Sequence, residues 1–340
     1  MTIRCGVGLI TCQRAPGETR SDVELYADAL SFAEAAERLG LDSVWVSEHH
    51  FVDDGYLPSL LPMCAAIAAR TSRVEIGTAL LLAPLYEPLR LAEDAAVVDL
   101  ISGGRLILGL GLGWRDEEFE ALSIPLRDRV RRLEDAVAVC RTAWAGDAVG
   151  GVRPDVVVTP APARPGGPPI WIGGLSEPAA RRAGRIADGF MATEVTPATL
   201  AEQVGWVREE AERAGGTSAA RTISMHVPTY VHEGDPEADW AEVLAPHRYV
   251  GWKYEDMEGA RSRPAGSPSP PPITPEEETR LRAGIVFGDA AEVAATIRSF
   301  AEAAGGDLHF IARVYWPGLA RDRQEELLQR FSNDVVPLLA

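Results

Sequence analysis

The sequence lacks paired cysteines and long hydrophobic runs. Its 340 residues include four cysteines, which are dispersed without a CxxC pair or a metal-type spacing. This distribution predicts no disulfide framework and no metal site, and a reducing cytoplasm is the simpler setting. No apolar run reaches the length of a membrane span, and the first residues lack the apolar core of a signal peptide.

Positive charge is also scarce. Lys253 is the single lysine among 33 basic residues, which stand against 50 acidic residues and leave a formal net charge of −17. Because phosphates and anionic lipids would be repelled by such a protein, we expect no nucleic-acid partner and no membrane partner.

What the sequence contains is a regular alternation of strand-like and helix-like segments. Residues 41–51, LDSVWVSEHHF, show the unit clearly: an apolar-periodic helix ends at Gly40, a short β-branched and aromatic strand follows, and polar residues come next. The expected strands are 5–11, 43–47, 73–84, 105–114, 169–174, 187–191, 222–231 and 307–315. Eight strands alternating with helices favour a (β/α)8 TIM barrel over a doubly wound sheet, with residues 1–340 forming a single domain.

Residues 257–278 interrupt this alternation. The stretch contains GARSRPAGSPSPPPITPEEE, which is too rich in proline, serine and glycine for a helix or a central strand. Since helical segments flank it, we expect a mobile loop inserted before the last barrel units, in the position of a lid.

Glu48, His49 and His50 form the first candidate site, because the chemistry of parallel α/β proteins lies at the carboxyl ends of their strands. Consecutive residues at an extended strand end point in opposite directions, so one histidine is expected to act and the other to pack or hydrogen-bond. Imidazole is a general base near neutral pH, and no HxH or HExxH pattern indicates a metal. Arg313, near the end of the last strand, is expected to form a salt bridge inside the barrel mouth.

Glycines at strand ends form a second group of candidates. Gly109, Gly111 and Gly113 share one face of the fourth strand, where missing side chains leave room for a flat ligand or for another backbone, and both interpretations stay open. Gly173-Gly174-Leu175-Ser176 leads from the fifth strand into a helix, and its amides with the helix dipole favour a bound phosphate over a simple turn. The run RDRVRR, which includes Arg132, is either a counter-charge or a solvated face.

Together these stretches resemble the bacterial luciferase-like, flavin-dependent monooxygenase family. The matching pieces are GVGLITCQ, GLDSVWVSEHHF, VEIGTALLLAPLYEPLRLAEDAAVVDLISGGRLILGLGLGW, PIWIGGLSEPAARRAGRIADGF and the tail FSNDVVPLL. They cover nearly the whole chain, and they are specific as a set. The resemblance implies a (β/α)8 barrel that binds reduced flavin at the carboxyl ends of its strands.

The resemblance also assigns roles to residues. His49 matches the family's catalytic histidine beside the flavin. A non-proline cis peptide is implied at Ala79-Leu80, where a bulge supports the isoalloxazine ring. The loop Gly174-Leu175-Ser176 matches the one that holds the flavin phosphate, with Arg132 as the helix arginine that assists it. Gly111 stands where luciferase has a reactive cysteine, and the next residue lacks luciferase's arginine, so FMN needs another anchor or binds weakly as a diffusing co-substrate.

The implied activity is oxygenation of a small organic substrate. Reduced FMN (FMNH2), supplied by a separate flavin reductase, would react with O2 to give a C4a-(hydro)peroxide, while His49 handles protons. Strand-end positions place Trp114, Phe190, Met191 and Trp316 on the substrate side. The family commonly forms dimers through helices on one barrel flank, so a homodimer is expected.

Two other functions stay open. A coenzyme F420-dependent oxidoreductase shares the barrel and the motifs, and passes a hydride without activating O2. Glu48 before the two histidines favours the flavin branch only mildly. A non-catalytic flavin-binding partner subunit is the second alternative, and the presence of His49 argues against it.

Overall fold

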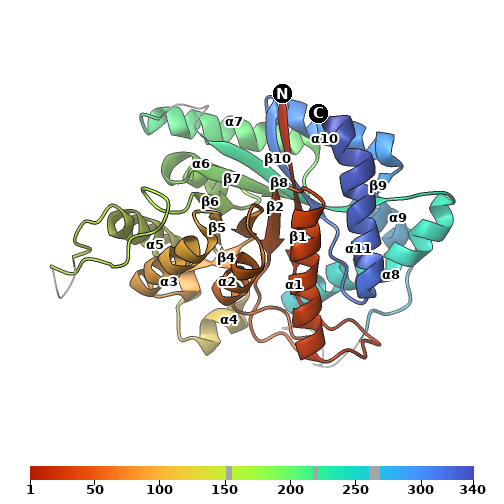
Figure 1. Cartoon of the computed structure of the whole chain (residues 1–340), viewed down its shortest axis with the longest axis horizontal. Coiled ribbons are helices and arrows are strands. Elements are labelled where there is room, and N and C mark those ends of the chain that lie inside the picture. Colours follow the sequence, from red (N-terminus) through yellow and green to blue (C-terminus); the bar gives the residue numbers. More distant parts are fainter. Residues whose placement is uncertain (151–154, 217–220, 260–268) are drawn as a thin grey trace.

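A closed barrel of parallel strands forms the centre of the computed structural model, which describes residues 1–150, 155–216, 221–259 and 269–340 (Figure 1). The barrel strands are β1 (Thr2–Ile10), β2 (Ser43–Val46), β3 (Glu75–Thr78), β5 (Leu106–Gly111), β6 (Ile170–Gly173), β7 (Gly189–Thr193), β8 (Thr222–Val231) and β10 (Asp307–Arg313). Each strand pairs in parallel with its neighbours, and β10 pairs with both β1 and β8, which closes the ring. The predicted (β/α)8 barrel is confirmed, and the doubly wound sheet is excluded.

The two chain ends lie close together, and the strands are surrounded by helices (Figure 1). They are α1 (Asp22–Arg38), α2 (Leu60–Arg70), α3 (Pro88–Ser102), α4 (Asp116–Ala121), α5 (Arg129–Trp144), α6 (Glu177–Ile186), α7 (Pro197–Arg213), α8 (Pro236–Gly259), α9 (Pro275–Ala283), α10 (Ala290–Ala303) and α11 (Arg321–Arg330), with short turns η1 (Ala83–Leu85), η2 (Leu126–Asp128), η4 (Phe331–Val335) and η5 (Val336–Leu339). Among these described helices, none is both long and apolar enough to cross a membrane.

Two strands differ from the expected pattern. The expected strand 73–84 is divided, because β3 ends at Thr78 and the short β4 (Leu81–Leu82) continues against β5. β9 (Val286–Gly288) was not expected and pairs with the last residues of β8, outside the closed ring.

The expected insertion 257–278 is helical at both of its described ends. α8 continues to Gly259, and α9 begins at Pro275; residues 260–268 lie outside the described part of the chain. The sequence explains the early start of α9: the side chain of Thr274 accepts a hydrogen bond from the Glu277 amide, a proline lies in the first turn, and three glutamates there favour the helix dipole.

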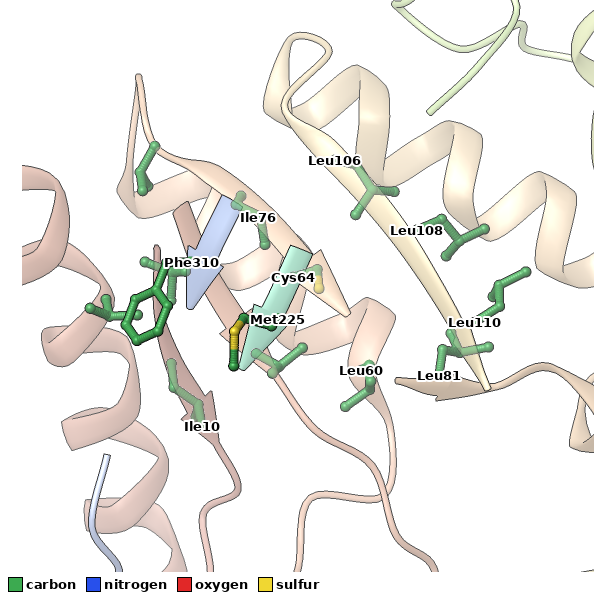
Figure 2. Close-up of a cluster of buried hydrophobic side chains, with 14 of the residues drawn as sticks. Ile10, Leu60, Cys64, Ile76, Leu81, Leu106, Leu108, Leu110, Met225 and Phe310 are labelled. Carbon is green, nitrogen blue, oxygen red and sulfur yellow. The ribbon is translucent and has the colours of Figure 1, made fainter. Parts of the chain in front are cut away.

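An outer apolar layer joins the barrel to its helices. Leu106, Leu108 and Leu110 alternate along β5 and are fully buried on its helix side, as Figure 2 shows. The residues between them therefore point into the barrel. In this way the sheet presents one face to the helices and the other to the barrel interior.

Two stacked indoles fill the barrel interior. The rings of Trp45 and Trp171 lie 5.1 Å apart with an interplanar angle of 28°. Glycines make room for them, since a Cβ at Gly77 would lie 2.2 Å from the Trp45 ring and one at Gly189 would lie 2.6 Å from Trp171. The barrel is thus a packed core, and a ligand must bind above it at the strand ends.

His309 lies buried beside these indoles, where its Nε2 is 2.7 Å from the Ser43 hydroxyl. Burial, with a smaller contribution from the charge of Arg4, lowers the pKa of His309 from 6.5 to about 3. Between these two values the unfolded chain binds the proton and the folded chain does not, so stability falls as the pH drops below 6.5.

We predict that His309→Gln reduces this acid sensitivity. Below pH 6.5, the free energy of unfolding should fall more steeply in the wild-type protein than in the variant. The difference in slope should be about 1.4 kcal/mol per pH unit. Urea denaturation at pH 7 and pH 5 measures the difference. Equal losses in the two proteins would contradict the assignment of a neutral, buried imidazole.

Candidate active site

The carboxyl ends of the parallel strands meet at one end of the barrel, and the candidate residues from different strands gather there. Beneath them lies an apolar floor that belongs to the inner cluster, made of Leu9, Ala79, Met191 and Ile311. Polar side chains form the walls above this floor, so the barrel mouth has an apolar base and a polar rim.

His49 follows β2 and is held by Glu118 of α4. Its Nδ1 lies 2.9 Å from Oε1 of Glu118, and the same oxygen accepts the His50 amide at 2.9 Å. Nε2 of His49 has no hydrogen-bond partner among the described residues. A carboxylate that accepts from Nδ1–H fixes the tautomer in which Nε2 accepts a proton. The arrangement thus offers a general base at Nε2 and a residue that orients it.

His50 turns to a different carboxylate. Its Nε2 lies 2.6 Å from Oε1 of the buried Glu48, whose other oxygen accepts the Leu82 amide at 3.2 Å. Burial raises the pKa of Glu48. For His50, burial lowers the pKa of the imidazole, but the bond to Glu48 together with the charges of Glu48 and Glu118 raises it above its usual value. The two histidines point to separate partners, as their consecutive positions predict.

The rings around His49 close the site. Tyr56 and Tyr254 meet the imidazole edge-to-face at 4.9 and 5.3 Å between centroids, and Trp114 does so at 5.8 Å. The hydroxyl groups of Tyr56 and Tyr254 lie 3.1 Å apart. Because Tyr254 belongs to α8, this helix covers the end of β2.

Further contacts fix α8 over the loop that follows β2. The Tyr249 hydroxyl donates to Oδ2 of Asp54 at 2.8 Å, and Lys253 forms an ion pair with Asp53. The single lysine of the chain therefore has a structural role, which composition alone did not indicate.

The peptide between Ala79 and Leu80 is cis, which confirms the prediction made from the resemblance. The Ala79 amide donates to the Val46 carbonyl at 2.7 Å, so the bulge is tied to β2. The Leu80 side chain lies between two strands, because a Cβ at Gly111 would lie 3.0 Å from it and one at Gly173 would lie 2.4 Å from it.

The glycine run of β5 accommodates this bulge. A Cβ at Gly109 would lie 2.0 Å from the Thr78 carbonyl oxygen, and Gly113, with φ +70°, approaches the Phe119 ring. For Gly109, the missing side chain admits a neighbouring backbone, which was one of the two interpretations of the sequence.

The loop Gly174-Leu175-Ser176 stands at the start of α6. Gly174 is required for close packing, since a Cβ added at this position would lie 2.4 Å from the Cβ of Ala179. Leu175 is exposed, and the Ser176 side chain makes no capping hydrogen bond to the helix. Gln203 of α7 donates to the Leu175 carbonyl at 3.2 Å and steadies the loop from below. The Gly174 amide donates to the Met191 carbonyl at 3.4 Å and Pro178 has no N–H, so the amides available to a ligand here are those of the exposed residues Leu175 and Ser176.

Arg132 makes its contacts elsewhere. Its Nε donates to the Pro84 carbonyl at 2.6 Å and an Nη donates to the Tyr86 carbonyl at 3.2 Å. Among the described residues, no hydrogen bond or ion pair joins it to Gly174-Leu175-Ser176. In this structure the guanidinium fixes η1 against α5, so its expected role at a phosphate finds no support here.

The four residues expected at the substrate lie in different surroundings. Trp114 lies beside His49 and is partly exposed, and Met191 points into the barrel floor. Phe190 is buried on the helix side of β7, since alternation gives it the opposite face from Met191. Trp316 packs with Tyr230 in a separate cluster under α8. The placements of Phe190 and Trp316 do not fit the expected lining.

Sequence reasoning missed Glu118, Tyr56 and Tyr254. Glu118 belongs to α4, a six-residue helix that was not expected, and it lies 69 residues from His49. The run Asp116–Ala121, with acidic residues in its first turn, was the available indication of a helix start.

For Arg313 the expected salt bridge is confirmed, with Nη1 3.1 Å from Oε1 of Glu194.

The family model described as luciferase-like monooxygenase matches residues 3–308. An F420-dependent glucose-6-phosphate dehydrogenase of Kineococcus radiotolerans is 31% identical over 91% of each chain. The oxygenase component of the flavin-dependent trigonelline monooxygenase of Acinetobacter baylyi is 26% identical over 94% of this chain and 91% of that protein.

Solved structures agree with the fold. The monooxygenase RslO1 of Streptomyces bottropensis superposes with a TM-score of 0.83 at 25% identity, over 99% of this chain and all of that one. An F420-dependent secondary alcohol dehydrogenase superposes with a TM-score of 0.75 at 21% identity, over the full length of both chains, and shows the fold alone.

Proposed function

The chain belongs to the luciferase-like monooxygenase family, whose members use a flavin or F420, and from this premise we propose that it is a monooxygenase that uses FMNH2 and O2 to oxygenate a small organic substrate. The observation that carries the proposal is the enclosure of His49 by Tyr56, Tyr254 and Trp114 beneath α8. Oxygen chemistry on a flavin needs a site that excludes water, and a covered imidazole meets that need.

The residues at the barrel mouth fit a flavin. The Ala79-Leu80 bulge, set into the space left by Gly111 and Gly173, offers an apolar support for a flat ring. In the loop Gly174-Leu175-Ser176, the amides of Leu175 and Ser176 would hold the phosphate at the helix N-terminus. Arg132 is held by the Pro84 and Tyr86 carbonyls and is not bonded to this loop, which supports FMN as a weakly bound co-substrate supplied by a separate reductase.

The chain's own residues would orient substrate and move protons. When bound, the reduced flavin supplies the electrons for oxygen activation. His49 would accept or return a proton at Nε2, and Glu118 would keep Nδ1 protonated and the ring in place. Tyr254 would keep water from the imidazole. A homodimer remains part of the proposal, supported by the exposed apolar row Val97, Leu100 and Ile101 on α3.

An F420-dependent oxidoreductase is the second candidate. Its support is that relatives at 30–31% identity over more than nine-tenths of this chain are F420-dependent glucose-6-phosphate dehydrogenases. The same His49 would then serve as a proton donor or acceptor in hydride transfer.

One experiment separates the two candidates. Purified protein is titrated without oxygen with FMNH2 and, separately, with reduced F420, and each mixture is then exposed to O2 in a stopped-flow spectrometer. We expect FMNH2 to bind and its oxidation to pass through a transient spectrum that matches neither reduced nor oxidised FMN. Retention of F420, with no effect of the protein on FMNH2 oxidation, would contradict the proposal and favour the dehydrogenase.

A further inference from the structure

A buried cation lies at the barrel mouth with most of its donors unused. Arg313 ends β10 and is 4% exposed. Ile311 points into the barrel and Ala312 toward the helices, so alternation turns the Arg313 side chain inward. Its one hydrogen bond within the described chain joins Nη1 to Oε1 of Glu194 at 3.1 Å. A guanidinium carries several N–H donors in a planar fork, so most of them lack a protein acceptor.

His226 lies on the neighbouring strand β8, two residues before Pro228, which is the register partner of Arg313. It is the register partner of Ile311 on one side and of Thr193 on the other, and its Nε2 lies 3.0 Å from the Thr193 hydroxyl. Nδ1 is buried and has no hydrogen-bond partner among the described residues. Burial, and then the charge of Arg313, lowers the pKa of His226 to about 3, so the imidazole is neutral.

The same charge reaches the residues around His49. Burial raises the pKa of Tyr254, and the nearby Arg313 opposes that rise; Arg313 acts on Tyr56 in the same way. Arg313 therefore lies near the two tyrosines that contact His49. The inner cluster below this end of the barrel is apolar.

Glu194 is a replaceable counter-ion. Its side chain is 41% exposed, and it lies just after β7 with φ +48°. Nε and Nη2 of Arg313 donate to no described residue and are not among the fully buried atoms without a partner, so they keep some accessible surface for a ligand. When the Thr193 hydroxyl donates to Nε2 of His226, Nδ1 carries the proton, and an acceptor group from a ligand would satisfy both this N–H and the guanidinium.

We propose that Arg313 and His226 bind a carboxylate of the substrate and thereby hold its remaining, apolar part over the barrel floor beside His49. This inference rests on the proposed function for the identity of the reacting site, and adds that the substrate is an organic acid. A carboxylate matches the planar guanidinium, and the neutral imidazole adds no second charge.

The test compares acids with their neutral amides. Isothermal titration of the full-length protein, with and without oxidised FMN, measures the binding of benzoate against benzamide and of hexanoate against hexanamide. We expect at least one acid to bind about tenfold or more tightly than its amide. Arg313→Gln should abolish this preference, and Arg313→Lys should retain part of it.

Two further variants serve as controls. Glu194→Gln should keep or increase the preference, because it removes the competing carboxylate. Arg182→Gln removes another buried arginine, which pairs with Glu134 at 3.1 Å on the outer helices, and should leave the preference unchanged. Circular dichroism of each variant establishes that it folds.

Three outcomes would overturn the inference. They are a wild-type protein that prefers neither acid, a preference that survives in Arg313→Gln, and a loss of FMN affinity in that variant without any effect on the acids, which would assign Arg313 to the cofactor. A wild-type protein that prefers an acid but binds neither oxidised nor reduced FMN would contradict the proposed function and leave the anion site standing.

Discussion

Replacing His49 by glutamine is expected to lower kcat for flavin-dependent substrate oxidation by about 10²–10⁴-fold, the range that a positioned general acid or base contributes. Glutamine retains a side chain that can hydrogen-bond to Glu118 but cannot exchange a proton near neutral pH. Affinity for reduced flavin should change little, because the phosphate is proposed to bind at the loop 174–176 and glutamine leaves the Ala79-Leu80 support of the ring in place. Turnover at saturating FMNH2 and a flavin titration measure the two quantities.

The neighbouring histidine provides the matched control. His50→Gln removes an imidazole from the adjacent position, but this one bonds to Glu48, and the loss of kcat should be much smaller. The loss of kcat in Glu118→Gln should lie between those of the two histidine variants, since this change leaves the His49 ring in place with a weaker acceptor at Nδ1. Unchanged turnover in His49→Gln would contradict the role of His49 in proton transfer, whereas flavin binding by the wild-type protein without any turnover would favour the non-catalytic partner subunit.

Gly109→Ala is expected to lower the free energy of unfolding by about 1–3 kcal/mol and to abolish flavin binding. The added Cβ would lie 2.0 Å from the Thr78 carbonyl oxygen, which is backbone and cannot rotate away. Thr78 also donates its hydroxyl to the Gly109 carbonyl at 2.7 Å, so separating the strands breaks that bond too. Relief requires moving the Ala79-Leu80 bulge, which is the proposed support of the flavin ring. Urea denaturation and FMN titration measure both effects.

Gly205→Ala is the control for this substitution. Gly205 lies within α7, and no atom lies within 4 Å of the position its Cβ would take. Alanine there should raise stability by roughly 0.5–1 kcal/mol and leave flavin binding unchanged. If the two glycine variants had the same free energy of unfolding, the close contact between β3 and β5 would not explain the effect of Gly109→Ala.

The barrel and the position of His49 were predictable because each rests on local pattern. Strands buried on both faces are nearly continuous in apolar residues. In a parallel fold, a polar cluster that follows such a strand lies at the carboxyl end of the sheet, where active sites form. Ser21 shows the same for helices: it accepts from the Glu24 amide in the capping box that begins α1. The cis peptide at Ala79-Leu80 came from the resemblance, since no local propensity indicates it.

The partners of the site residues were not predictable, because they depend on tertiary placement. The bond from His49 to Glu118 joins residues that follow two different strands, β2 and β5, and lie 69 residues apart, so no local pattern indicates it. Phe190 shows a second difficulty: the expected strand 187–191 begins two residues before β7, and only the observed alternation shows which side chains face inward. Arg132 was assigned by resemblance, while its backbone acceptors lie 46 and 48 residues away.

The central claim is that one flavin binds across the barrel mouth, with its ring on the Ala79-Leu80 bulge beside His49 and its phosphate at the start of α6. A crystal structure of the protein with FMN tests this most directly. We expect the phosphate oxygens at the loop 174–176, within hydrogen-bond distance of the amides of Leu175 and Ser176, and the ring in contact with Leu80. A flavin bound at the opposite end of the barrel, or one whose ring does not contact the bulge, would contradict the account.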